Sequence, residues 1–197
     1  MLFNSFQFIW LFPIIFIGYY LICSFTKCSY SRWDNYTLLL ISYLLYAQWK
    51  PVFVIVLLWV TLITYIGGRL LINVKYKWIL SACLCLAVAP LIFFKYYGFI
   101  NETICSLVGY SISLKGLNWA IPIGLSFYTF QAIGYVVDVY YKRVEPEKNW
   151  WDYMLFVSFF PQILSGPISK ATDLLPQIKS RRVFNPSLIP QNYFHQF

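Results

Sequence analysis

Six predominantly apolar stretches of this chain contain no charged residue, and they limit the folds that it can adopt. They are residues 1–26, 35–49, 51–68, 78–94, 116–137 and 153–169. A transmembrane helix needs about 20 apolar residues, with a range of roughly 17–25. Because 60% of the 197 residues are hydrophobic and only 11% are charged, a water-soluble fold could not bury the apolar surface. We therefore expect an all-α, polytopic transmembrane helix bundle that forms a single membrane domain, 1–197.

The six stretches differ in how they are expected to meet the bilayer. We expect the first, third, fourth and fifth to cross it, and the second and last to be tilted, packed inside the protein or re-entrant. The first stretch has neither a basic leader nor a small-residue cleavage site, so we expect it to be a retained helix. Lys50-Pro51 is expected to separate two helices, with Pro51 in the first turn of the second. Asp34 and Asn35 are the expected caps of the helix before it, and the helix containing Pro90 is expected to end near Lys95.

The net charge of +8 is better explained by membrane topology than by a nucleic-acid-binding surface, because the basic residues lie between apolar segments. Alternate connections would place eight basic residues on one side and three on the other, which predicts an amino terminus outside the cytoplasm. The basic cluster from Lys170 to Arg182 would then lie outside if the last stretch crossed fully. We expect that cluster to stay cytoplasmic, so the last stretch should dip into the membrane and return. The eight residues are Lys27, Arg32, Arg69, Lys75, Lys77, Lys142, Arg143 and Lys148, and the three are Lys50, Lys95 and Lys115.

The fifth stretch carries polar side chains inside an apolar segment. Ser126, Thr129 and Gln131 lie within it, and Asp138 follows at its end. Polar groups in lipid are costly unless they find partners or water, so these residues should face the bundle interior or a wet cavity. A second interpretation stays open, in which they only tie helices together and Asp138 pairs with a basic neighbour such as Lys142 or Arg143.

The stretch from Phe159 to Lys170 combines two prolines, a glycine and a glutamine with apolar residues. Pro161 and Pro167 interrupt helical hydrogen bonding, and Gly166 permits unusual backbone angles. Irregular backbone must be buried in protein or line water inside a membrane. This favours a re-entrant element beside a substrate path, although a kinked helix that ends at the surface fits the same residues.

Two strings carry a family resemblance. IPIGLSFYTFQAIGYVVDVYYK and FFPQILSGPISKATDLLPQI resemble signatures of bacterial membrane-bound O-acyltransferases, in the branch that acetylates alginate or transfers D-alanine to teichoic acid. SYLLYAQWKPVFVIVLLWVTLITYIGGRL and FFKYYGFINE extend the resemblance upstream. It therefore covers most of the chain to about Asn185, and indicates the amino-terminal part of a longer enzyme.

The resemblance implies transfer of an acyl group, with acetyl favoured, from a cytoplasmic donor to a hydroxyl of an extracytoplasmic glycan. The donor would be acetyl-coenzyme A or a carrier-protein thioester, with no bound cofactor or metal, and the five cysteines match no metal-binding spacing. The implied surroundings are the bacterial inner membrane, a cell-envelope glycan and extracytoplasmic acetylation partners, with no nucleic acid. On position and chemistry, we expect the donor half of a substrate tunnel to be lined by Ser126, Tyr128, Gln131 and Gln162 and shaped by Ser165, Gly166 and Pro167. Asp138 and Lys170 are expected near the cytoplasmic face, in contact with a donor or a partner.

The catalytic base of the resembled family has no counterpart in this sequence. Members use a histidine deep in the membrane as general base, whereas the single histidine here, His195, lies in a polar tail. We therefore assign no catalytic residue and expect the chain to be inactive alone. A non-enzymatic transporter or scaffold subunit, and the product of a disrupted gene, remain alternatives.

Overall fold

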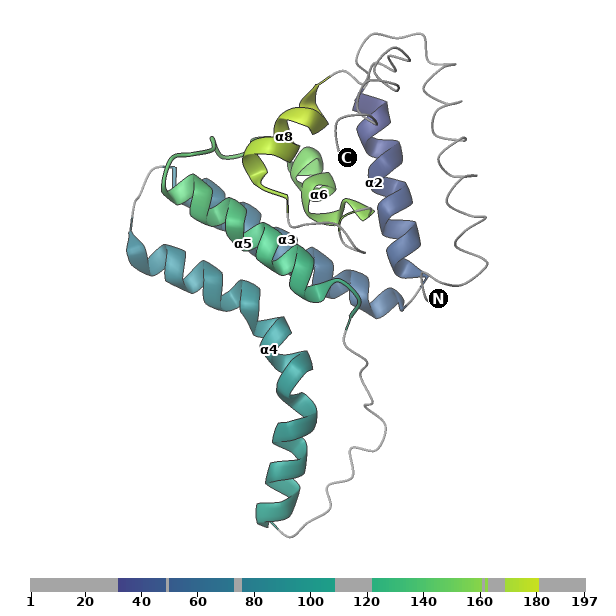
Figure 1. The fold of residues 1–197 in the computed structure, drawn as a ribbon, viewed down its shortest axis with the longest axis vertical. Coiled ribbons are helices and arrows are strands. Elements are labelled where there is room, and N and C mark those ends of the chain that lie inside the picture. The colour runs from purple at the N-terminus through teal and green to yellow at the C-terminus, as the bar shows by residue number, and fades with distance from the viewer. Residues whose placement is uncertain are drawn as a thin grey trace, which may run out of the picture.

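The computed structural model describes residues 32–48, 50–72, 76–108, 122–160, 162 and 169–180. The described residues form helices and no strand, which confirms the all-α class. The helices are α2 Arg32–Ala47, α3 Pro51–Leu70, α4 Lys77–Val108, α5 Leu125–Tyr140, α6 Trp150–Ser158 and α8 Ala171–Lys179 (Figure 1). Among these residues two segments are long and apolar enough to cross a membrane: α3, and Lys77–Tyr96 of α4.

Prolines and glycines set several helix boundaries. Pro51 opens α3 in its first turn, as predicted, because the missing amide hydrogen is not needed there. Gly124 has a φ of 73° and precedes Leu125, so α5 begins only there. The 16 residues of α5 rise about 24 Å. The expected crossing over 116–137 is therefore represented by a helix shifted toward Tyr140, and the first expected crossing lies outside the described residues.

Two predicted boundaries were wrong. α2 begins at Arg32, so Asn35 lies inside the helix rather than capping it. α4 continues past Lys95 to Val108, because no proline or other strong breaker stops it there. Pro90 lies inside α4, and Figure 1 shows that this helix bends partway along its length. The bend is expected from the hydrogen bond that proline removes.

α3 is the centre of the bundle and contacts α2, α4, α5 and α6. Its inner face contributes fully buried Leu57 and Val60 to a core that also contains the rings of Tyr135, Tyr153 and Phe156. The outer faces of α3 and α4 expose large apolar side chains, as a helix bundle in lipid requires. They include Ile55, Trp59, Leu62 and Ile66 on α3 and Leu86, Ile92 and Phe93 on α4.

Glycine allows two helices to approach α3 closely. A Cβ on Gly67 would lie 2.3 Å from Cys83 Sγ of α4, and one on Gly68 would lie 2.8 Å from the Tyr135 ring of α5. Small residues at such positions are typical of helix contacts in membranes. The pair therefore serves packing, and α3 continues beyond it to Leu70.

The chain returns after α6 to the end of the bundle where α6 begins. The side-chain amide of Asn35 donates to Asp152 Oδ1 near the start of α6 and to the Ile178 carbonyl near the end of α8, each at 3.1 Å. α6 has nine residues and rises about 14 Å, too short to cross a bilayer. This geometry is the return that the prediction of a re-entrant segment requires.

Candidate functional site

A bridge of amide side chains joins α5 to Gln162 and Ser169, which follow α6 in the chain. Gln131 is buried, and its Nε2 donates to the Phe156 carbonyl at 2.8 Å. α6 ends at Ser158, so its last carbonyls lack helical partners. Gln131 Nε2 also lies 3.4 Å from Gln162 Oε1, and Gln162 Nε2 donates to Ser169 Oγ. The bridge thus stabilises the end of α6 and brackets residues 163–168.

A second group, the hydroxyl cluster, consists of hydroxyl-bearing side chains on α2 and α5. We define it as Ser42, Tyr43 and Tyr46 on α2 with Tyr128 and Thr129 on α5. The rings of Tyr46 and Tyr128 meet edge to face, with centroids 6.3 Å apart. Ser42, Tyr128 and Thr129 are at most 2% exposed. The hydroxyls of Ser42 and Thr129 have no hydrogen-bond partner within the described part of the chain, whereas the Tyr128 hydroxyl faces that of Tyr46.

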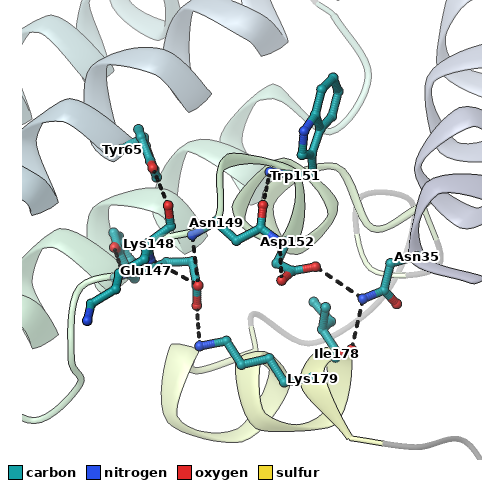
Figure 2. Close-up of polar contacts among 10 residues, drawn as sticks. Asn35, Tyr65, Glu147, Lys148, Asn149, Trp151, Asp152, Ile178 and Lys179 are labelled. Carbon is teal, nitrogen blue, oxygen red and sulfur yellow. Dashed lines mark hydrogen bonds and ion pairs between the residues drawn. The ribbon is translucent and has the colours of Figure 1, made fainter. Parts of the chain in front are cut away.

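A network of polar contacts closes one end of the bundle (Figure 2). The buried Glu147 carboxylate accepts from the backbone amides of Lys148 and Asn149 at 3.0 and 3.1 Å, and pairs with Lys179 Nζ of α8 at 2.6 Å. The Glu147 amide donates to the Tyr135 hydroxyl at 2.9 Å. These contacts fix the loop between α5 and α6 against α8.

The same network holds the start of α6. Asn149 Oδ1 accepts from the Trp151 amide at 3.2 Å, which caps the helix. Asn149 Nδ2 donates to Asp152 Oδ2 at 2.8 Å, and the Tyr65 hydroxyl of α3 donates to the Lys148 carbonyl at 2.9 Å. The network therefore positions α2, α3, α5, α6 and α8 at this end. The role of this network is structural, because its polar groups form hydrogen bonds and an ion pair with one another.

A cleft of about 440 Å³ opens between the α5–α6 loop and α8. Arg143 and Lys179 line it together with Glu145 and Glu147, so its formal charges balance. Lys179 is paired with Glu147, and Arg143 with Asp138. The cleft does not favour an anionic ligand for these reasons. Its other lining residues are Val144, Ala171, Thr172, Leu175 and Pro176.

The residues singled out in the sequence divide into three groups. Gln131 and Gln162 are brought together, and Tyr128 is buried one turn of α5 before Gln131. Ser126 is exposed on another face of α5 and does not join them. Ser165, Gly166, Pro167 and His195 lie outside the described residues.

The two residues assigned to the cytoplasmic face lie apart from the amide bridge. Asp138 pairs with Arg143 at 3.4 Å, as the second interpretation of this residue expected. Lys170 is exposed at the N-cap position of α8. Neither contacts the hydroxyl cluster through an interaction found in the structure.

Sequence reasoning missed the α2 half of the hydroxyl cluster and the Glu147 network. The tyrosines of α2 look like ordinary aromatic residues of an apolar helix, although Ser42 and Tyr46 share one face by their spacing of four. Glu147 lies in a connection, where an acidic residue is usually solvated. Its carboxylate is buried because α8 packs against this connection, and no local sequence pattern predicts that packing.

The chain is similar over most of its length to O-acetylases of two polysaccharides. It is 34% identical over 191 residues to a probable alginate O-acetylase of Pseudomonas aeruginosa, covering 92% of this chain and 35% of the relative. A probable alginate O-acetylase of Azotobacter vinelandii is 30% identical over 190 residues, covering 92% and 36%. A peptidoglycan O-acetyltransferase of Helicobacter pylori is 27% identical over 215 residues, covering 92% and 39%.

The chain spans little more than a third of the length of these relatives. No protein-family model matches it, and no solved structure matches it.

Proposed function

Because the chain is homologous over 92% of its length to O-acetylases of the membrane-bound O-acyltransferase family, we propose that it forms the amino-terminal, acyl-donor side of a polysaccharide O-acetyltransferase. The observation that carries the proposal is the pair of acceptors named by its relatives. Alginate and peptidoglycan differ in their sugars, and the relatives share O-acetyl transfer to a glycan hydroxyl. That shared reaction is the function proposed for the protein that contains this chain.

The reaction needs a path for an acetyl group from a thioester donor to a hydroxyl across the membrane. We propose acetyl-coenzyme A or a carrier-protein thioester as the cytoplasmic donor, and an extracytoplasmic polysaccharide as the acceptor. Polar groups buried between apolar helices support such a path, because they give a polar substrate partners inside lipid. In this chain we propose the buried Tyr128 and Gln131 and the half-buried Gln162 as those groups, and Ser165, Gly166 and Pro167 as residues that shape the path beside them.

No general base for the acceptor hydroxyl is assigned to a described residue. The described residues contain no histidine, and His195 remains assigned to a polar tail. We propose that the base comes from sequence corresponding to the remaining two thirds of the relatives. On this proposal the 197 residues alone bind or guide the acyl donor and do not complete transfer.

The test is expression in a bacterial strain that lacks its own polysaccharide O-acetyltransferase. The chain is produced as these 197 residues and, in parallel, with any coding sequence that adjoins them, and glycan-bound acetate is measured. Acetylation by the extended form alone supports the proposal. Acetylation by neither form, with both present in the membrane, would contradict it and favour a transporter or scaffold subunit.

A further inference from the structure

An exposed arginine lies near the end of α3. This helix has 20 residues and rises about 30 Å, the thickness of the hydrocarbon core of a bilayer. Arg69 is the residue before its last, so it lies at one boundary of that core. The boundary is at the end of the bundle that the Glu147 network closes, called here the network end. Arg69 is exposed and forms no ion pair with an acidic residue of the described part of the chain.

The connection before α6 brings a second cationic residue to the same place. Tyr65 lies one turn before Arg69, and its hydroxyl donates to the Lys148 carbonyl at 2.9 Å. Arg69 also interacts electrostatically with Tyr135. The Tyr135 hydroxyl accepts from the Glu147 amide at 2.9 Å, and Lys148 is the next residue and is exposed. Two exposed cationic residues from separate elements therefore lie near each other.

The buried acidic groups at this end already have partners. Glu147 pairs with Lys179 at 2.6 Å, and Asp152 accepts from two asparagine side chains. The positive charges of Arg69 and Lys148 are therefore available to an anion from outside the bundle. A phosphate group suits them, because a guanidinium can donate two parallel hydrogen bonds to its oxygens.

An apolar stripe on α3 leads from Arg69 into the membrane. Ile55, Leu58 and Leu62 lie 14, 11 and 7 residues before Arg69, and these spacings are close to whole turns of the helix, so the four share one face. The three apolar side chains are 66%, 36% and 44% exposed. Leu58 lies about 16 Å from Arg69 along the axis, about half of the 30 Å hydrocarbon core. The face thus combines a cationic end with an apolar length that matches one leaflet.

We propose that Arg69 and Lys148 bind the phosphate of an anionic phospholipid whose acyl chains lie along this apolar stripe. A soluble anion would use the two cations alone, whereas a phospholipid also covers the exposed apolar side chains below them. The rings of Tyr65 and Trp150 meet beside the cations, with centroids 4.9 Å apart, and such rings favour the level of the lipid headgroups. The inference needs only a bundle in a bilayer and does not depend on acyl transfer.

The test measures how much an anionic lipid stabilises the protein. The 197-residue chain in a neutral detergent is heated with phosphatidylglycerol, with phosphatidylcholine or with inorganic phosphate at one concentration. Phosphatidylglycerol should raise the melting temperature by about 5 °C near saturation. Phosphatidylcholine and inorganic phosphate should raise it much less, because each supplies only part of what the face binds.

Three variants assign the effect to the proposed site. Arg69→Gln and Lys148→Gln should each lose most of the increase that phosphatidylglycerol gives. Lys77→Gln is the matched control, because it removes one exposed positive charge from the first residue of α4, at the same end of the bundle. This variant should keep the full increase. If Arg69→Gln does not accumulate, Lys148→Gln decides the question, since it lies in an exposed connection.

The remaining outcomes each overturn the proposal. Equal loss in all three variants would reduce the effect to general surface charge. Equal stabilisation by phosphatidylcholine would remove the role of the headgroup charge, and equal stabilisation by inorganic phosphate would identify a soluble anion. Loss of the effect in a form extended by adjoining coding sequence would show that another helix covers this face. No stabilisation by phosphatidylglycerol in the wild type would show that the face binds no such lipid.

Discussion

Gln131 is the residue whose role the sequence indicated most directly, because an amide in an apolar helix needs a partner. The partner is the Phe156 carbonyl, left open where α6 ends. Gln131→Leu should destabilise the protein by about 1–3 kcal/mol, since that buried carbonyl would lose its hydrogen-bond donor. Thermal unfolding in detergent measures the effect. Gln177→Leu, at an exposed position of α8, is the control, and equal stability of the two variants would contradict this role of Gln131.

The Glu147–Lys179 pair predicts an asymmetry between its two members. Glu147 is 4% exposed and Lys179 is 50% exposed, so loss of the lysine leaves a buried carboxylate, whereas loss of the carboxylate leaves a lysine that can turn to water. Lys179→Ala should therefore cost more than Glu147→Gln, by about 1–2 kcal/mol after allowance for the exposed side of the pair. Unfolding of both single variants and the double variant measures this. A larger cost for Glu147→Gln, or no cost for either, would show that the ion pair does not hold α8.

At the scale of elements, the glycine contacts of α3 give a prediction with an internal control. Gly67→Ala and Gly68→Ala should each destabilise the bundle by about 1–3 kcal/mol, because the new methyl group would overlap Cys83 Sγ or the Tyr135 ring. Gly134→Ala on α5 has no atom within 4 Å of the added Cβ. That variant should be neutral or more stable by up to about 1 kcal/mol.

The glycine prediction is checked by the melting temperatures of the three variants in one detergent. Adding Cys83→Ala to Gly67→Ala should restore part of the lost stability, because it removes the sulfur that the methyl group would meet. Equal effects of all three alanines would instead indicate helix propensity, and would remove the argument for close packing.

The sequence predicted a helix correctly where apolar length and proline determine it. It did not predict the boundaries of helices where packing determines them. Pro51 fixed the start of α3 because it acts through its own backbone. α4 extends beyond Lys95 because a lysine and two tyrosines can lie at an interface without ending a helix. Gln131 and Gln162 could be predicted as internal from polarity alone. The Tyr46–Tyr128 contact could not, since it depends on how two helices distant in sequence face each other.

At the scale of the whole molecule, basic residues gather at the end of the bundle that the Glu147 network closes. Tyr65 contacts the Lys148 carbonyl, which places the end of α3 with its Arg69 beside the start of α6. Lys179 lies there too, through Glu147, while Lys50 precedes the opposite end of α3. This arrangement of basic residues agrees with the charge count over the connections. The sequence alone could not establish at which end of the bundle the residues after α6 lie.

This arrangement predicts which side of the membrane each end faces. By the positive-inside rule the network end should be cytoplasmic. In a background with the five native cysteines replaced by serine, Lys148→Cys and Lys170→Cys should react with an impermeant maleimide only after the membrane is opened, and Lys50→Cys in intact spheroplasts. The reverse pattern would invert the orientation. Labelling of positions 148 and 170 from opposite sides would show that the segment between them crosses, and the re-entrant assignment would then be wrong.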